Sequence, residues 1–266
     1  MKRVVSRVYL AFILLFLYAP IFVLIVFSFN ESKSRANFTG FTLKWYEELF
    51  RDDLIMTSLW NTLLIAVLAS VFSTVLGTAA ALGMKNMKRR ARSLCMNLTY
   101  MPVINPEIVM AISMMLLFVY ICRIFDWELG MITVLIAHIT FCVPYVILNV
   151  LPKLRQMDQN IYEAALDLGC TPVSAFFKVV IPEILPGVVS GFLMAFTFSL
   201  DDFIITYFTN GSDFQTLPVT IYSMTRRRVS PKINALSTIL FLVVLLILIL
   251  MNVRQARALK NREQER

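Results

Sequence analysis

The sequence predicts an all-α integral membrane protein with six transmembrane helices and both termini in the cytoplasm. Its 266 residues are 58% hydrophobic and only 16% charged, and the mean hydropathy is +0.73. Soluble domains average about 45–50% apolar and about 25% charged residues, so this composition excludes an ordinary soluble protein. The apolar residues are gathered in long runs, and a helix needs about 20 such residues to cross a bilayer.

Six runs have the required length, and we expect them to form a single transmembrane domain over residues 1–266. They lie at about residues 8–29, 60–84, 94–121, 129–151, 184–208 and 235–253. The apolar core of the first run is too long for a secretory signal, and no small-x-small cleavage site follows it. The first run is therefore expected to remain in the protein as a membrane anchor.

The placement of positive charge predicts the direction of these helices. Sixteen of the 25 Lys and Arg residues lie at the two termini, in the loop 85–92 and within the segment 152–183. Lys and Arg collect on the cytoplasmic side of membrane proteins, so both termini and the segment 152–183 are expected there. The cluster 226–228 and Lys232 fall on the opposite side and are outnumbered. The positive residues lie where they set orientation, so the net charge of +8 gives no reason to expect nucleic-acid binding.

The segment 152–183 is a polar interruption whose pattern predicts a helix, a glycine bend and a second short helix. Apolar residues recur at helical spacing before the bend, at Ile161, Ala164, Ala165 and Leu168. Gly169 is expected to end the first helix, because glycine readily adopts the positive φ of a C-terminal stop. Thr171 and Pro172 suit the cap and the first position of the second helix, which we expect to stop before Pro182.

This segment resembles the EAA loop of ABC importer permeases, with Val179 and Ile181 where that pattern usually has Ile and Leu. The resemblance implies a type I importer permease fold with this loop seated on an ATPase subunit. It assigns the coupling role to Glu163, Ala164, Ala165, Asp167, Gly169 and Pro182. The chain has no Gly-rich P-loop, so ATP and Mg²⁺ would be bound by the partner ATPase and no cofactor by this chain. The alternative is an amphipathic connector that lies on the membrane.

Three acidic residues occur inside the predicted spans, at Glu107, Asp201 and Asp202. Ionisable groups in a span cost about 2.5–3.5 kcal/mol on insertion scales, so each is a functional hypothesis. A cationic cargo would supply the counter-charge that the spans lack. The alternatives are aspartates that are hydrated or paired with Arg226–Arg228 at the outer interface, and a protonated Glu107 bonded inside the bundle. His138, the one histidine, is expected to be a packed, hydrogen-bonded core residue.

Two further patterns bear on these acids. On a continuous helix Ser199, Asp202 and Thr206 would share one face, with Asp201 about 100° away, so the two aspartates are poorly placed to form a catalytic dyad. The stretch 40–50 suggests a short amphipathic helix that carries Trp45. Trp45 would lie at the membrane interface, either as an anchor or where it meets cargo or a partner.

Five stretches resemble the spermidine/putrescine branch of the ABC permeases. They are GFTLKWY at 40–46, PEIVMAIS at 106–113, HITFCVPYV at 138–146, FSLDDF at 198–203 and VSPKINALSTI at 229–239. The resemblance implies polyamine handling by Trp45, Glu107, Ser199, Asp201 and Asp202, in the bacterial inner membrane. Glu107 stands where a shorter Asp is common in this branch, so its reach to an amine differs.

The resemblance also implies a set of partners: a related second permease, two ATPase subunits and a periplasmic polyamine-binding protein, within the membrane lipid. No metal site is expected. The remaining alternatives are an ABC permease for another small cation and an ion-gradient carrier or cation channel. The acids and the Asn105-Pro106 break suit a carrier or channel, which gives no reason for the EAA spacing.

Overall fold

The computed structural model describes residues 2–32, 37–227, 231–243, 245, 246 and 249. Across these residues the chain is helical, apart from loops and one isolated antiparallel bridge between Asn30 and Phe41. It divides into two compact units, a terminal unit of residues 1–56 and 221–266 and a central unit of residues 57–220. The boundaries fall within α3 (Asp53–Lys85) and α11 (Leu217–Arg227).

The terminal unit contains α1 (Lys2–Ser28), α2 (Lys44–Phe50) and a helix over Pro231–Val243. The apolar window of α1 is not buried inside the protein, as expected for an anchor that faces lipid. The amphipathic helix expected at 40–50 is confirmed as α2, which buries Trp45 and Leu49.

Ion pairs connect α2 to the last described helix of this unit. The Nζ atom of Lys232 lies 3.5 Å from a carboxylate oxygen of Glu48 and 3.5 Å from one of Asp52. Two acids of the terminal unit therefore pair with Lys232, one of the positive charges that the sequence places on the side opposite to the cytoplasm.

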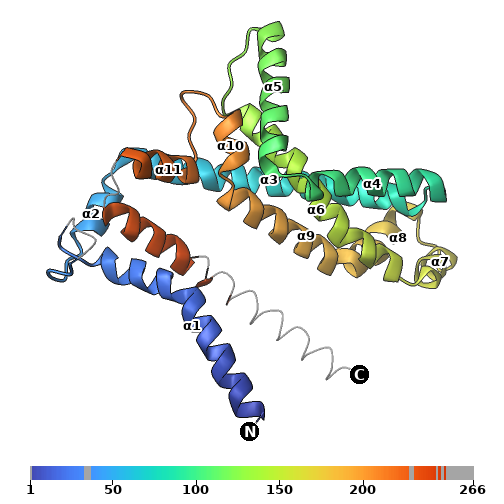
Figure 1. Ribbon diagram of the computed structural model, residues 1–266. Coiled ribbons are helices and arrows are strands. Elements are labelled where there is room, and N and C mark those ends of the chain that lie inside the picture. Colours follow the sequence, from blue (N-terminus) through green and yellow to red (C-terminus); the bar gives the residue numbers. More distant parts are fainter. Residues whose placement is uncertain (1, 33–36, 228–230, 244, 247–248, 250–266) are drawn as a thin grey trace. The chain divides into compact units, whose positions relative to one another are not determined.

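The central unit is built from the remaining helices, which Figure 1 labels. After α3 they are α4 (Arg89–Ile104), α5 (Glu107–Phe125), α6 (Met131–Gln156), α7 (Gln159–Asp167), α8 (Pro172–Ala175), the π-helical turn η1 (Phe176–Val180), α9 (Ile181–Asp201) and α10 (Ile204–Thr209). Helix α6 packs against α4, α9 and α10, and α5 packs against α10. The core of the unit therefore surrounds α6.

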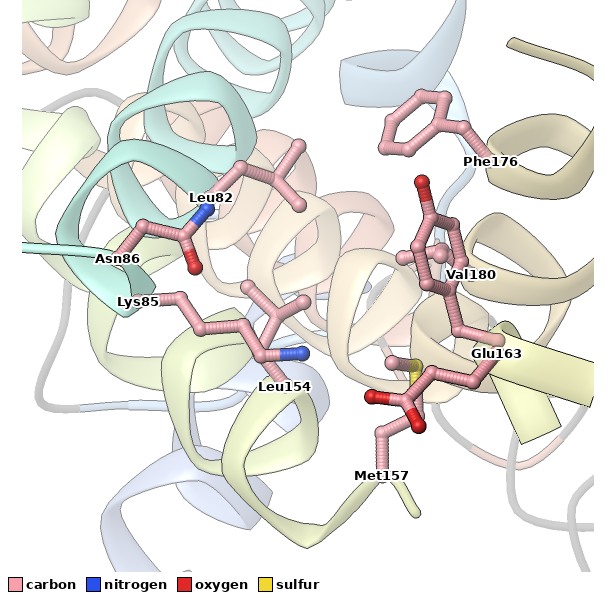
Figure 2. Close-up of a pocket in the computed structure, with 9 residues that line it drawn as sticks. Leu82, Lys85, Asn86, Leu154, Met157, Glu163, Phe176 and Val180 are labelled. Carbon is pink, nitrogen blue, oxygen red and sulfur yellow. The ribbon is translucent and has the colours of Figure 1, made fainter. Parts of the chain in front are cut away.

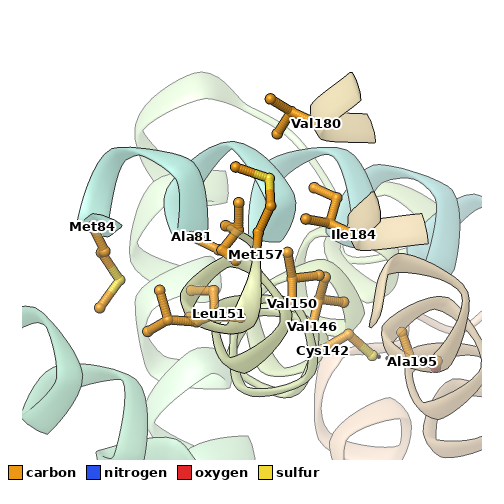
Figure 3. Close-up of a cluster of buried hydrophobic side chains, with 12 residues drawn as sticks. Ala81, Met84, Cys142, Val146, Val150, Leu151, Met157, Val180, Ile184 and Ala195 are labelled. Carbon is orange, nitrogen blue, oxygen red and sulfur yellow. Dashed lines mark hydrogen bonds between the residues drawn. The ribbon is translucent and has the colours of Figure 1, made fainter. Parts of the chain in front are cut away.

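Glycines allow the close approach of helices to α6. A Cβ atom added at Gly191 of α9 would lie 3.2 Å from the Cα atom of Val146, and one at Gly77 of α3 would lie 2.6 Å from its Cβ atom. Gly187, one turn before Gly191, meets α6 in the same way. Small residues at this spacing let membrane helices pack backbone to backbone. The cluster of buried apolar residues that results includes Val146, Val150, Ile184 and Ala195 (Figure 3).

The helix predicted at 94–121 is interrupted. Asn105 and Pro106 are both extended, with ψ of 143° and 131°, and they separate α4 from α5. The residue before a proline is disfavoured in the α conformation, so Asn105-Pro106 ends α4 instead of only kinking a longer helix. The two helices run in different directions from this point (Figure 1).

The helix predicted at 184–208 is interrupted as well. Asp202 has an extended ψ of 126°, which separates α9 from α10. Glu107 and Asp201 thus lie at helix ends next to the two breaks, in the first turn of α5 and at the last residue of α9.

Five helices of the described chain are long and apolar enough to cross a membrane. They are Ser6–Ser28 within α1, α3, α5, α6 and the continuous stretch Pro172–Asp201 from α8 to α9. Of the run predicted at 235–253, the structure describes the helix Pro231–Val243 and residues 245, 246 and 249, and the rest lies outside the described residues. The count of six spans and the cytoplasmic side of the termini stay predictions.

The glycine contacts predict opposite effects of the same substitution at two positions of α3. Gly77→Ala places a methyl group against Val146, and overpacking of this kind costs about 1–3 kcal/mol. Gly83→Ala meets no atom within 4 Å and gains about 1 kcal/mol of helix propensity. Thermal unfolding of the detergent-purified protein should give a lower Tm for Gly77→Ala and an equal or higher Tm for Gly83→Ala. Equal Tm values for the two variants would contradict this packing.

Candidate functional site

The break between α9 and α10 is capped by the side chain of Asp202. Its Oδ1 atom accepts a hydrogen bond from the Ile205 amide at 3.2 Å, and Oδ2 accepts from the Thr206 amide and hydroxyl, both at 2.8 Å. The first amides of a helix have no partner within the helix, and an aspartate side chain commonly supplies one. Asp202 therefore starts α10 instead of extending α9.

His138 of α6 joins the two sides of this break. Its Nε2 atom lies 2.9 Å from Thr206 Oγ1 and 3.3 Å from Asp202 Oδ2, and its Nδ1 atom lies 2.6 Å from Ser199 Oγ. The prediction of a packed, hydrogen-bonded histidine is confirmed. The structure brings Ser199, Asp202 and Thr206 together as the sequence suggested, with a helix break between them and with a partner from α6 that the sequence pattern did not reveal.

Asp201 and Glu107 have the opposite environment. Both residues are exposed, and their charges interact electrostatically. Glu107 comes from the start of α5 and Asp201 from the end of α9, so the two interruptions bring two accessible acidic side chains into range of each other. This pair is the part of the predicted acidic set that a solute can reach.

Tyr145 is a site residue that the sequence reasoning missed. Its ring centroid lies 4.4 Å from that of Phe198, one turn before Asp201, and Glu107 is close enough for its charge to act on the Tyr145 hydroxyl. Both aromatic rings are partly exposed. Tyr145 follows His138 by seven residues, which is two helical turns and places both on one face of α6. That spacing was the available signal.

The predicted helix–bend–helix segment is confirmed in its first part. Helix α7 begins after Asp158, whose side chain accepts from the Asn160 amide at 2.9 Å. Gly169 has a φ of +86°, the left-handed conformation expected at the bend. Thr171 then caps α8 by accepting from the Ser174 amide at 3.3 Å, with Pro172 at the helix start.

The second helix of this segment does not stop before Pro182, as the sequence analysis expected. It continues through the wider turn η1 into α9, with Pro182 in the first turn of α9. A proline lacks a backbone donor and crowds the preceding turn. A π-helical turn, in which hydrogen bonds reach one residue farther, can accommodate such an irregularity within a continuing helix.

A cavity of about 360 Å³ lies under the segment, between the ends of α3 and α6 and the start of α7. Lys85 of α3 and Glu163 of α7 enter it from opposite sides, and Leu154 of α6 and Met157, the residue after α6, also line it (Figure 2). These two apolar residues belong to the same buried cluster as Val180. None of the α7 side chains described by the structure is fully buried, and Tyr162 and Glu163 of this helix line the cavity.

The outer surface of the segment is apolar. Leu168 is 87% exposed, and Ile161, Val173 and Phe177 are exposed as well. Exposed apolar groups on this scale indicate a surface that contacts another molecule. Ala164 and Asp167 lie between these residues in the sequence and are also exposed, and Glu163 is exposed as well, with its side chain in the cavity.

Trp45 belongs to the terminal unit, where it is buried. Its indole N–H donates to the backbone carbonyl of Asn30 at 2.7 Å. The Tyr46 hydroxyl lies 2.7 Å from Ser28 Oγ, so α2 is bound to the end of α1 at two adjacent positions. The indole N–H of Trp45 is thus used within the protein.

A protein-family model matches residues 73–260, which include most of the central unit and both candidate regions. Its description is "Binding-protein-dependent transport system inner membrane component". The chain belongs to this family. It is therefore an inner-membrane component of a binding-protein-dependent transport system, and it is a transport subunit and not an enzyme.

Curated members of the family are similar over most of their length. The "Putrescine transport system permease protein PotI" of Escherichia coli (strain K12) is 40% identical over 85% of this chain and 81% of the relative. The "Spermidine/putrescine transport system permease protein PotC" of the same strain is 36% identical over 88% of this chain and 87% of the relative. PotC of Haemophilus influenzae is 34% identical, with coverages of 88% and 90%.

Two solved structures share the fold. One is a bacterial ABC transporter involved in the import of the acidic polysaccharide alginate, with a TM-score of 0.70, 15% identity, and coverage of 96% of this chain and 95% of that chain. The other is an amino acid ABC transporter, with a TM-score of 0.54, 21% identity, and coverages of 80% and 99%. They confirm the predicted ABC importer permease fold.

The left-handed bend makes a prediction about Gly169. A side chain at a positive φ costs about 1–2 kcal/mol, except that Asn tolerates this conformation. Gly169→Ala should therefore increase the rate of hydrogen exchange in α7, whereas Gly169→Asn should increase it less. A Cβ atom added at this position meets no atom within 4 Å, so crowding at Cβ does not obscure the comparison. Equal exchange in all three proteins would show that the bend imposes no such demand.

Proposed function

We propose that this chain is a transmembrane subunit of an ATP-driven importer for polyamines such as spermidine and putrescine. The observation that carries the proposal is the similarity, over most of the chain, to permease proteins named for putrescine and spermidine transport. The accessible acids and aromatic rings beside the two helix breaks support it independently, because their chemistry suits a flexible organic cation.

The proposed cargo surface consists of Glu107, Tyr145, Phe198 and Asp201. Carboxylates at Glu107 and Asp201 would accept hydrogen bonds from the ammonium groups. The aromatic pair would lie along the methylene chain and attract cationic groups through the ring faces. Ser199, Asp202 and Trp45, the other residues predicted for the pathway, have polar atoms that already bind within the protein, so their contribution is proposed to be indirect.

The segment 152–183 is proposed as the surface that docks on the ATPase. Its exposed apolar residues give a partner an area to bury. Glu163, Ala164, Ala165, Asp167, Gly169 and Pro182 keep the coupling role that the EAA resemblance implies. ATP and Mg²⁺ would be bound by the ATPase, whose closure would move α7 and α8 and alternate the opening of the spans.

The complete importer is proposed to contain a second, related permease, two ATPase subunits and a periplasmic polyamine-binding protein. The cargo would pass from the binding protein to the outer mouth and along the interface of the two permeases. The most direct test is reconstitution of the complex in liposomes with polyamine-stimulated ATP hydrolysis as the readout. Uptake by the chain in the absence of any ATPase would favour a carrier. Stimulation of ATP hydrolysis by another small cation and not by polyamines would identify that cation as the substrate.

Removal of the accessible charge at the end of α9 should weaken cargo capture. Asp201→Asn is expected to raise the KM for putrescine uptake about tenfold, which corresponds to ~1.4 kcal/mol, because one ammonium loses its carboxylate. Asp213→Asn, the same change at an exposed loop residue, is the matched control and should leave KM unchanged. The proposed cargo surface would be wrong if the two variants behaved alike.

Charge reversal on α7 should uncouple cargo transport from ATP hydrolysis by the ATPase subunits. Glu163→Lys is expected to abolish both uptake and cargo-stimulated ATP hydrolysis while the protein still reaches the membrane at normal abundance. Glu128→Lys changes an exposed residue just before the start of α6, at the end of that helix away from α7. This variant should keep both activities. Wild-type coupling in Glu163→Lys would refute the docking role of this residue.

A further inference from the structure

Two neighbouring carboxylates at the end of α9 have opposite surroundings. Asp201 is exposed, whereas the side chain of Asp202 is 6% exposed and that of the adjacent His138 is 1% exposed. Although the two aspartates are adjacent in the sequence, solutes can reach Asp201 and cannot reach Asp202.

The acceptor capacity of Asp202 is taken up by the chain itself. Its two oxygens accept from the Ile205 amide, the Thr206 amide and the Thr206 hydroxyl, and Oδ2 also faces His138. A cargo ammonium that bound Asp202 would have to displace these buried donors, and an unpaired buried donor is costly. The contacts therefore argue against direct capture of cargo by Asp202.

The donor count around His138 shows how the ring connects the two helices. The Thr206 hydroxyl gives its single proton to Asp202 Oδ2, so the proton between Thr206 and the ring comes from Nε2. In the neutral ring this leaves the Nδ1 atom, 2.6 Å from the Ser199 hydroxyl, as the acceptor of that hydrogen bond. One imidazole thereby contacts the last turn of α9, the cap residue and the first turn of α10.

Helix α10 is also held to α6 at its other end. The Thr133 hydroxyl lies 2.8 Å from the carbonyl oxygen of Thr209. Ala137 of α6 and Ile205 of α10 also belong to one buried apolar cluster. The position of α10, and with it the point at which α9 stops, is therefore set from α6.

We propose that His138 is a positioning residue that, by pairing with Asp202, holds the break between α9 and α10 so that Asp201 alone offers its carboxylate to the cargo. This inference rests on the proposed function for the identity of the cargo. It assigns different roles to the two adjacent aspartates: Asp201 contacts cargo, and Asp202 acts through the geometry of the break.

The test measures putrescine uptake by the complete importer for single and combined variants. His138→Leu removes both ring nitrogens, whereas His138→Gln keeps one donor and one acceptor. Asp202→Asn keeps one acceptor but turns an amide donor toward either the Ile205 amide or the Thr206 and His138 donors. Thr140→Ala is the control, because this exposed hydroxyl lies on the same helix and donates to the carbonyl of Ile136 in its own turn.

We expect His138→Leu and Asp202→Asn each to lower Vmax/KM about tenfold and the double variant to be no worse than the more severe single one. His138→Gln should recover most of the loss at equal abundance, and Thr140→Ala should behave as the wild type. In an Asp201→Asn background, neither His138→Leu nor Asp202→Asn should raise the KM further, because the carboxylate that they position is gone.

Two results would overturn the inference. Multiplicative losses in the double variant would mean that His138 and Asp202 act separately. A further rise of about tenfold in KM when Asp202→Asn is added to Asp201→Asn would mean that Asp202 contacts cargo itself.

The thermal stability of the same variants separates failure of this inference from failure of the proposed function. Shifts in Tm for His138→Leu and Asp202→Asn should be non-additive in the purified protein whatever it transports. If the wild-type importer takes up no polyamine but the Tm shifts are non-additive, the proposed cargo is wrong and the pairing of His138 with Asp202 stands. Additive Tm shifts would overturn the pairing even if polyamine uptake were intact.

Discussion

A helix that ends within or beside a membrane leaves amide and carbonyl groups that lipid cannot satisfy. In this protein that constraint applies most clearly between α9 and α10, where one helix ends and the next begins within a predicted span. Asp202 satisfies the free amides of α10, and His138 fixes Asp202 and Ser199 from a neighbouring helix. The interruption is thus a constructed feature, and the exposed acid next to it owes its position to the buried one.

The same helix α6 provides the contact surface for the rest of the central unit. Its Val146 faces glycines of both α3 and α9, so the backbones approach closely on two sides. In its first half α6 carries His138 and near its middle Tyr145, and beyond its end it leads into α7 through the cap at Asp158. The same central helix therefore contributes to the proposed cargo surface and connects to the proposed ATPase-docking segment.

Local sequence patterns predicted a large part of this structure, since apolar runs, caps and a left-handed glycine act over a few residues. The bend at Gly169 and the cap at Thr171 followed from residue types alone. The break at Asp202 did not, because the run 184–208 is apolar on both sides and an aspartate within it can be a cargo ligand or a helix cap equally well. Only the packing of α6 on α9, which brings His138 to a residue 64 positions later, separates these alternatives.

The extra irregularity at Pro182 has a similar origin. A proline usually marks a helix boundary, and the sequence analysis placed the end of the second short helix there. The wider turn η1 instead lets the helix pass through, which no short pattern in the sequence specified. Trp45 illustrates the converse case: the aromatic residue suggested an interfacial surface, and its buried bond to Asn30 became visible only from the fold.

The unbroken course from Pro172 to Asp201 has a mechanical consequence. These 30 residues form one helix of about 45 Å at 1.5 Å per residue. The exposed apolar residues Val173 and Phe177 lie near one end, and the exposed carboxylate of Asp201 lies at the other. A displacement of these apolar residues by the proposed ATPase partner would reach that carboxylate through hydrogen-bonded backbone, without an intervening loop. The five-residue π turn η1 lies between the two ends, so the displacement would have to pass through this change in helical hydrogen bonding.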